Sequence, residues 1–267
     1  MKNFIKAILN SLGFEIIRKT KNFHANEFLT DEKFEVKFRR LTLFGYQYFL
    51  PNYALHRPAV KKFLNGDLYE PHTHNFVNKF CSAFKGSMIH AGTFFGDMLP
   101  SFSKSVSGIV YAFEPVLENY ILAKLCVEFN KLTNVILMNC ALSDRTGILY
   151  INKIESNGKH AGGASKISDR GEICVAIRID NLSIRDLILI QLDVEGHELN
   201  VLKGAQNTIQ KNRPVIAIED NNNSCTELLQ NIKYENIGRI PGLSIWTPTE
   251  NKIYKEQVMA ILNEINC

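Results

Sequence analysis

The chain has 267 residues, of which 45% are hydrophobic and 22% are charged, and its formal net charge is +4. This composition is typical of a globular protein and excludes the disordered and fibrous classes. Basic residues form no dense patch, so we expect no nucleic-acid partner, and no apolar run approaches the ~20 residues that span a bilayer. The six cysteines lie far apart without a CxxC pair, which disfavours disulfides or a zinc site and favours the cytoplasm.

The start of the chain carries apolar residues at helical spacing beside lysines. These are Phe4, Ile5, Ile8, Leu9 and Leu12, next to Lys2 and Lys6. The pattern predicts a helix whose apolar face has two alternative binding partners. It either docks on its own domain or makes a weak contact with a membrane surface through residues 1–20, at the inner membrane face.

The rest of the N-terminal part is less regular. A strand is predicted at 41–49, and helices are predicted at 59–64 and 73–84. We therefore expect residues 1–86 to form a helical or irregular extension that caps the following domain.

From residue 87 onward, short apolar runs alternate with amphipathic stretches, which is typical of β-α alternation. Strands are predicted at 88–91, 109–113, 135–139, 187–192 and 215–218, with helices at 97–106, 117–129 and 198–210. The end of the chain predicts two closing strands, at 234–239 and 243–247, and a helix at 254–262. Runs such as LILIQL are apolar throughout, as expected where helices cover both faces of a parallel sheet. Residues 87–267 should therefore form one α/β domain, a doubly wound, mostly parallel seven-stranded sheet.

One insertion interrupts this alternation. Segments 147–154 and 172–179 predict an antiparallel pair of strands, joined by a polar, glycine-rich loop at 155–171. The composition SNGKHAGGAS suits a loop that closes over a ligand, and equally a solvated connector.

The stretch IHAGTFFGD, residues 89–97, turns from a predicted strand into a predicted helix. Its glycines, Gly92 and Gly96, give a G-x-x-x-G spacing rather than the G-x-G-x-x-G that binds a pyrophosphate. The next strand ends in Glu114, about 20 residues further on, where an acid can accept protons from two ribose hydroxyls. A ligand with a carboxylate, an ammonium and a ribose fits this arrangement best, which favours S-adenosylmethionine.

A third strand end, NCALSD at 139–144, should flank the same crevice, because ligands of open α/β sheets lie outside the carboxyl ends of the strands. The small Ala141 and the backbone of Leu142 suit a flat adenine ring. Taken alone, the segment predicts only a turn.

The fourth strand end, DVEGHEL, places Asp193, Glu195 and His197 at the crevice. Methyl transfer to a hydroxyl requires a base, and His197 is the candidate by residue type. The alternative is an exposed, inert histidine in the first turn of a helix, with the acids serving as helix caps.

The fifth strand end adds further oxygen ligands, because Glu219, Asp220 and Asn221 follow it directly. Together with Asp193, they predict a candidate Mg²⁺ site that would hold two oxygens of a substrate. Solvated acids or helix caps are the alternative explanation.

The ordered set of motifs resembles the FkbM family of S-adenosylmethionine-dependent methyltransferases. The motifs are LYEP at 68–71, IHAGTFFGD, YAFEP with Asn119, NCALSD, IRIDNL at 177–182, LDVEGHELNVLKGA at 192–205 and RPVIAIE at 213–219. The resemblance implies a class I methyltransferase fold and a cofactor site made by His90, Gly92, Thr93, Gly96, Asp97, Glu114, Pro115, Asn119, Ala141, Leu142 and Asp193. The family usually has aspartate at the position of His90, so this chain departs there.

The resemblance also implies an acceptor class, since family members mostly methylate hydroxyls of sugars, glycolipids or polyketides. Residues 69–74 resemble the family's cap over the site, which makes His72 and His74 candidate substrate contacts. We therefore expect an O-methyltransferase for a small-molecule or glycan acceptor, with Asp193, Glu195 and His197 as catalytic candidates. The rivals are a nicotinamide-dependent oxidoreductase and a binding protein that kept the fold without the chemistry.

Overall fold

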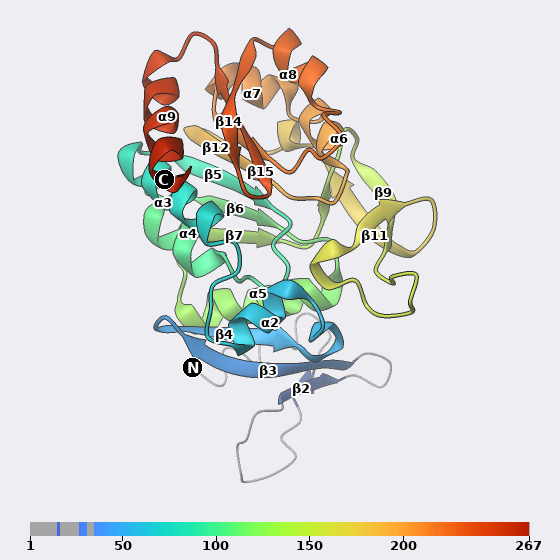
Figure 1. The fold of residues 1–267 in the computed structure, drawn as a ribbon. Helices are drawn as coiled ribbons and strands as arrows, with labels where there is room; N and C mark the ends of the chain where they lie inside the picture. Colours follow the sequence, from blue (N-terminus) through green and yellow to red (C-terminus); the bar gives the residue numbers. More distant parts are fainter. Residues whose placement is uncertain (1–14, 17–26, 31–34, 267) are drawn as a thin grey trace.

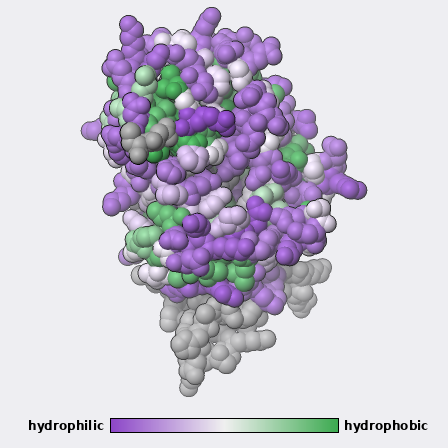
Figure 2. Space-filling model, viewed as in Figure 1, coloured by the Kyte–Doolittle hydropathy of each residue, from purple (hydrophilic) through white to green (hydrophobic). Residues whose placement is uncertain are grey.

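The computed structural model describes residues 15–16, 27–30 and 35–266 (Figure 1). The helix predicted for the start of the chain lies outside these residues. Among the described helices, none combines the length and the apolar character needed to cross a membrane. The face shown in Figure 2 is mostly hydrophilic, with hydrophobic residues in small separate areas.

A seven-stranded sheet forms the centre of the molecule, with the strand order β14-β15-β13-β12-β5-β6-β7. Its strands are β5 (Ser87–Ala91), β6 (Val110–Phe113), β7 (Val135–Met138), β12 (Leu187–Leu192), β13 (Val215–Ile218), β14 (Tyr234–Ile240) and β15 (Leu243–Pro248). Strand β15 runs antiparallel to both neighbours, and the other pairings are parallel. The predicted doubly wound, mostly parallel sheet is confirmed.

Helices cover both faces of this sheet, and its strands are therefore buried on both sides. Met88 and Leu189 pack with α3 (Pro71–Ala83), α4 (Leu99–Ser105) and α9 (Lys252–Asn266). The neighbouring Ile89 and Ile190 pack with α6 (Glu198–Lys203), α7 (Gln206–Asn212) and α8 (Thr226–Asn231). Helix α5 (Leu117–Asn130) connects β6 to β7.

The predicted helix at 198–210 is in fact two helices, α6 and α7, separated at Gly204 and Ala205. A Cβ on Gly204 would overlap the backbone oxygen of Ser143. The chain therefore breaks its helix at the point where it passes close to another backbone.

The N-terminal part contains a second, antiparallel sheet, which corrects the expected helical or irregular extension. Its strands are β1 (Glu15–Ile16), β2 (Glu27–Thr30), β3 (Glu35–Leu43) and β4 (Tyr46–Pro51). The single strand predicted at 41–49 was wrong, because Phe44 and Gly45 both adopt positive φ and turn the chain between β3 and β4. A short 3₁₀ helix, η1 (Asn52–Ala54), and α2 (Pro58–Leu64) follow.

This sheet packs on α5, at the bottom of Figure 1. Phe38, Phe49 and Phe63 share one buried cluster with Phe95 of the glycine turn and Leu122 of α5. The extension thus supports the back of the turn that carries the candidate site. Helix α3 also precedes residue 87, yet it packs in the core of the central sheet.

The insertion forms a third sheet, ordered β10-β9-β11-β8, with β9 and β11 antiparallel as predicted. Its strands are β8 (Ala141–Leu142), β9 (Gly147–Asn152), β10 (Lys166–Ser168) and β11 (Glu172–Ile177). Leu149 and Ile151 point inward and are buried, whereas the intervening Ile148 and Tyr150 are exposed. The loop at 155–171 is partly ordered by β10 and by the 3₁₀ turn η2 (Gly162–Ala164).

Candidate functional site

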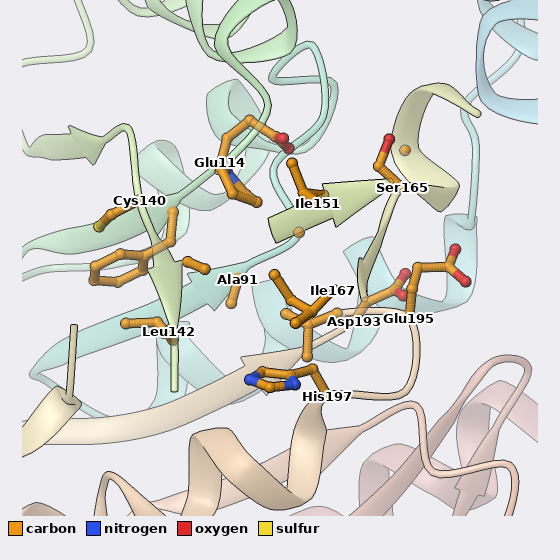
Figure 3. Close-up of a pocket in the computed structure, with 16 residues that line it drawn as sticks. Ala91, Glu114, Cys140, Leu142, Ile151, Ser165, Ile167, Asp193, Glu195 and His197 are labelled. Carbon is orange, nitrogen blue, oxygen red and sulfur yellow. The ribbon is translucent and has the colours of Figure 1, made fainter. Parts of the chain in front are cut away.

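A pocket lies at the carboxyl ends of β5, β6 and β12, and the insertion covers it (Figure 3). Its empty volume of about 480 Å³ includes the open solvent at its mouth. The strand ends contribute Ala91, Gly92, Phe113, Glu114, Pro115, Cys140, Ala141, Leu142, Asp193, Val194, Glu195 and His197. The insertion contributes Ile151, Gly163, Ser165 and Ile167. The pocket is therefore largely apolar, with a few polar side chains at its edges, among them Glu114, Asp193 and His197 (Figure 3).

The glycine turn brings β5 into contact with the end of β12. Gly92 has a φ of 93°, and a Cβ there would overlap the backbone oxygen of Asp193. Gly96 has a φ of 84° and packs closely against Ala123 of α5. The two glycines are thus needed for backbone packing, and only Gly92 also lines the pocket.

Glu114 points into the pocket from the end of β6 and is held by three N–H donors. Its carboxylate accepts from the backbone of Phe94 at 2.7 Å, the backbone of Val116 at 2.9 Å and the side chain of Asn119 at 3.3 Å. Burial raises the pKa of Glu114 to about 7, although these donors oppose the increase. Oε1 accepts two of these bonds and Oε2 accepts one, so Oε2 keeps an acceptor position for the predicted contact with a ribose hydroxyl.

His90 faces away from the pocket, so its predicted contact with a cofactor is not formed. Side chains alternate along β5, and the His90 ring enters the layer beside α4, where it contacts Phe102 edge to face at 5.1 Å. Its Nδ1 hydrogen-bonds with Gln191 on the adjacent strand. Burial lowers the pKa of His90 to about 4, with a further decrease from the nearby His74.

Several other predicted residues lie behind the pocket wall. Thr93 is buried and its hydroxyl donates to the backbone oxygen of Phe113. Gly96, Asp97 and Asn119 also lie outside the lining. Burial raises the pKa of Asp97 to about 7, and the neighbouring Glu70 raises it further. These residues can support the site, but they do not form its surface.

The two cap histidines differ in their surroundings. His72 is exposed, whereas His74 is buried on the inner side of α3, 5.8 Å from the Phe102 ring. Burial lowers the pKa of His74 to about 4. His74 therefore belongs to the core beside His90, which corrects its prediction as a substrate contact.

Three carboxylates meet at the ends of β12 and β13. Oxygens of Asp193, Glu195 and Glu219 all lie within 4.8 Å of one another. Burial raises the pKa of Asp193 well above its usual range, and the adjacent Glu219 adds to the increase. Lys166 of the insertion lies 3.5 Å from Glu195. The cluster can hold a proton between two of its acids, or it can hold a cation.

Asp220, predicted as a metal ligand, is used elsewhere. Its carboxylate accepts from the backbone N–H groups of Ser224 at 2.9 Å and Cys225 at 2.8 Å, just ahead of α8. These bonds satisfy donors that the start of a helix leaves free. Glu195 takes the third place in the acidic cluster instead.

His197 lines the pocket with both ring nitrogens engaged. Nε2 lies 3.0 Å from the Ser143 hydroxyl, and Nδ1 lies 3.2 Å from the side-chain amide of Asn200. Burial lowers the pKa of His197, which keeps the ring neutral at pH 7. Through Ser143, the ring is tied to the Ala141–Leu142 side of the pocket rather than to the three carboxylates.

The sequence predicted a loop that could close over a ligand, but not which side chains of the insertion line the pocket. Ile151 lies in a predicted strand, whereas Ile167 lies in β10, within the segment predicted as a loop. Tyr53 of η1 donates a hydrogen bond to Asn119, 66 residues further along the chain. No local pattern could have indicated this contact.

The central sheet and its pocket define the class of the protein. A doubly wound sheet with an antiparallel strand near one edge, and a crevice at the carboxyl ends of its parallel strands, is the class I methyltransferase fold. The family model for the methyltransferase FkbM domain matches residues 90–237, which is more than half of the chain. The chain therefore belongs to the FkbM methyltransferase domain family.

Comparison with other proteins gives distant similarities. The curated proteins include no significant match. A solved methyltransferase FkbM from Methylobacillus flagellatus is 17% identical, with a TM-score of 0.46, and the match covers 61% of this chain but only 43% of that one. A ribosomal protein L11 methylase from Lactobacillus delbrueckii subsp. bulgaricus is 11% identical, with a TM-score of 0.41 and coverage of 68% and 80%. The TYW2 of M. jannaschii, solved with AdoMet, is 11% identical, with a TM-score of 0.37 and coverage of 86% and 89%.

Proposed function

We propose that this protein transfers a methyl group from S-adenosylmethionine to a hydroxyl of a sugar, glycan or similar polyol. The observation that carries the proposal is the position of Glu114, whose carboxylate faces an apolar pocket at the carboxyl end of the second parallel strand. Membership of the FkbM domain family supports methyl transfer. The sugar-type acceptor rests on the family resemblance.

The pocket residues fit this cofactor by their chemistry. Glu114 offers its Oε2 to a ribose hydroxyl, and Leu142 and Ile151 offer apolar walls to the adenine. Gly92 and Asp193 line the pocket side by side, where the amino-acid end would lie. When bound, the cofactor supplies an electrophilic methyl group on a sulfonium.

The acceptor hydroxyl must lose its proton as its oxygen bonds to the methyl carbon and the carbon–sulfur bond breaks. Asp193 is our first candidate for the base, because its raised pKa makes its carboxylate a stronger proton acceptor than an exposed aspartate. Glu195 lies beside it and can orient the acceptor. His197 is the alternative base, since the imidazole lines the same pocket.

A second possibility for the three carboxylates is a divalent cation such as Mg²⁺. Asp193, Glu195 and Glu219 provide the all-oxygen ligands that this ion prefers. The ion would neutralise the cluster and hold acceptor oxygens. Turnover that is lost with a chelator and restored by Mg²⁺ would support this assignment, and turnover unaffected by the chelator would contradict it.

Calorimetry with S-adenosylhomocysteine tests the cofactor site. Glu114→Ala should weaken binding about 10- to 100-fold, because a hydrogen bond to a carboxylate is lost. Glu128→Ala serves as the control, since Glu128 is a half-buried acid near the other end of α5 that pairs with Lys124. Equal affinity of both variants would contradict the placement of the cofactor.

Two further measurements separate the rival functions. A thermal-shift panel of nucleotides should show stabilisation by S-adenosylmethionine and none by nicotinamide cofactors. Transfer of an isotopically labelled methyl group to a panel of glycans, with the product mapped by NMR, should place the label on oxygen. Cofactor binding without transfer to any acceptor would favour the non-catalytic alternative.

A further inference from the structure

The N-terminal extension reaches the cofactor pocket through one hydrogen-bond network. The Tyr53 hydroxyl donates to Oδ1 of Asn119 at 2.8 Å. The amide nitrogen of Asn119 donates to Glu114 at 3.3 Å and to the backbone oxygen of Gly162 at 3.2 Å. Asn119 is fully buried, so these three partners account for its amide.

The geometry allows only one orientation of this amide. If the amide were flipped, its oxygen would face the carboxylate of Glu114 and the carbonyl of Gly162, which are both acceptors. In the observed orientation, Oδ1 needs a donor, and Tyr53 supplies it. Burial raises the pKa of Tyr53 well above its usual range, so the hydroxyl keeps its proton.

The same network holds the loop that covers the pocket. The Gly162 oxygen also accepts from the hydroxyl of Ser165 at 2.8 Å, and Ser165 and Gly163 both line the pocket. The Tyr53 ring packs on His160 at 4.3 Å between centroids. One tyrosine therefore contacts both the amide behind Glu114 and the covering loop.

We propose that Tyr53 is a positioning residue of the cofactor site. Through Asn119 it aligns the Glu114 carboxylate for the ribose hydroxyls and fixes the covering loop at Gly162. This inference rests on the proposed function, because it assumes that a ribose occupies the pocket beside Glu114.

The test compares two tyrosines of the extension, the half-buried Tyr53 and the buried Tyr48. Tyr53→Phe removes only the hydroxyl, and Tyr48→Phe is the matched control. Tyr48 is buried in the cluster with Phe63, and its hydroxyl makes no hydrogen bond with any described residue. Tyr53→Phe should weaken S-adenosylhomocysteine binding about tenfold, as expected for a buried acceptor left without its donor, whereas Tyr48→Phe should stay within about twofold of the wild type.

Two readouts distinguish positioning from a general loss of structure. In steady-state kinetics, Tyr53→Phe should raise the KM for S-adenosylmethionine and leave kcat within about twofold at saturation, because uniform binding is affected. In hydrogen exchange without ligand, residues 155–165 should exchange faster in Tyr53→Phe than in Tyr48→Phe. Adding Asn119→Ala should remove the difference between tyrosine and phenylalanine at position 53, since the amide carries the coupling.

The outcomes separate this inference from the function on which it rests. If the wild type binds no S-adenosylhomocysteine, the proposed function is wrong and the inference falls with it. If the wild type binds and Tyr53→Phe binds equally well, the inference alone is overturned. Additive losses in Tyr53→Phe and Asn119→Ala would also overturn it.

Discussion

The floor and the cover of the pocket are held in place by different kinds of contact. The floor consists of turns after β5, β6 and β12, and adjacent parallel strands fix these turns through backbone hydrogen bonds, such as that from Asp193 N–H to the Ala91 oxygen. The cover is the third sheet with the loop at 155–171. Its strands are paired with one another, but it is held over the floor by side chains far apart in the sequence, such as Arg57 and Glu155, whose atoms lie 2.6 Å apart. Substitutions in the floor should therefore destabilise the whole domain, whereas substitutions in the cover should cause smaller losses of stability.

Gly92→Ala should show the largest effect, because the floor has no room for a side chain. The new Cβ would overlap the Asp193 backbone oxygen, and alanine is strained at a φ of 93°. We expect a loss of roughly 3 kcal/mol or more in the free energy of unfolding. Urea denaturation followed by circular dichroism measures it.

Gly158→Ala is the control for this substitution. Gly158 has a φ of 78° in the covering loop, with open space around its Cβ position. Gly158→Ala should lower the free energy of unfolding by only about 1 kcal/mol, because only backbone strain is added. Similar losses for Gly92→Ala and Gly158→Ala would show that the close approach to Asp193 is unimportant and would remove the proposed contrast.

Asp193→Asn should have the next largest effect, on turnover. The asparagine keeps the shape but cannot accept the acceptor's proton, so kcat should fall about 100-fold or more. His197→Ala should lower kcat less, because both ring nitrogens are already engaged by Ser143 and Asn200. Methyl transfer under saturating cofactor measures both variants. A larger loss for His197→Ala would reassign the base to the histidine.

The sequence predicted the floor better than the cover for a physical reason. Strand β12 was placed at its observed limits because a strand buried on both faces must be apolar throughout. Its turn residue Asp193 follows directly in the chain. The pairing of Tyr53 with Asn119 depends on packing of the extension against α5, which leaves no local pattern.

The errors within the floor have equally local causes. His90 was assigned to the pocket by its place beside Gly92, although alternation along β5 directs it to the opposite face from Ile89 and Ala91. Asp220 and Glu219 could not be separated by sequence, because the turn that ends at Cys225 decides which carboxylate caps α8.

His90→Gln should have a smaller effect that depends on pH. Because the pKa of His90 is lowered to about 4, the folded protein keeps the ring neutral while the unfolded chain takes up a proton below about pH 6.5. The histidine therefore destabilises the wild type as the pH falls from about 6.5 toward 4, and glutamine does not titrate. The difference in the free energy of unfolding between the wild type and His90→Gln should therefore shift against the wild type as the pH falls over this range. The shift should be at most about 1.4 kcal/mol per pH unit.

Urea midpoints of both proteins at pH 7.5, 6.0 and 5.0, roughly spanning this range, check the trend. Asp97 and Glu114, whose pKa values burial raises to about 7, give the opposite trend in both proteins and cancel in the difference. His74→Gln should behave like His90→Gln, because burial lowers the pKa of His74 to about 4 as well. A difference that stays constant with pH would show that His90 is not kept neutral by the core.

Ile173→Thr should have the smallest effect, because it lies on the outer face of the cover. Its side chain is 67% exposed on β11, opposite the exposed Tyr150. Threonine is as suited to a strand as isoleucine, so the free energy of unfolding should change by less than about 0.5 kcal/mol. Ile151→Thr provides the contrast on the inner face, where the side chain is 3% exposed and lines the pocket, and it should cost about 2 kcal/mol or more. If Ile173→Thr were as costly as Ile151→Thr, the outer face would be buried in solution, and the cover would be an interior layer rather than a surface one.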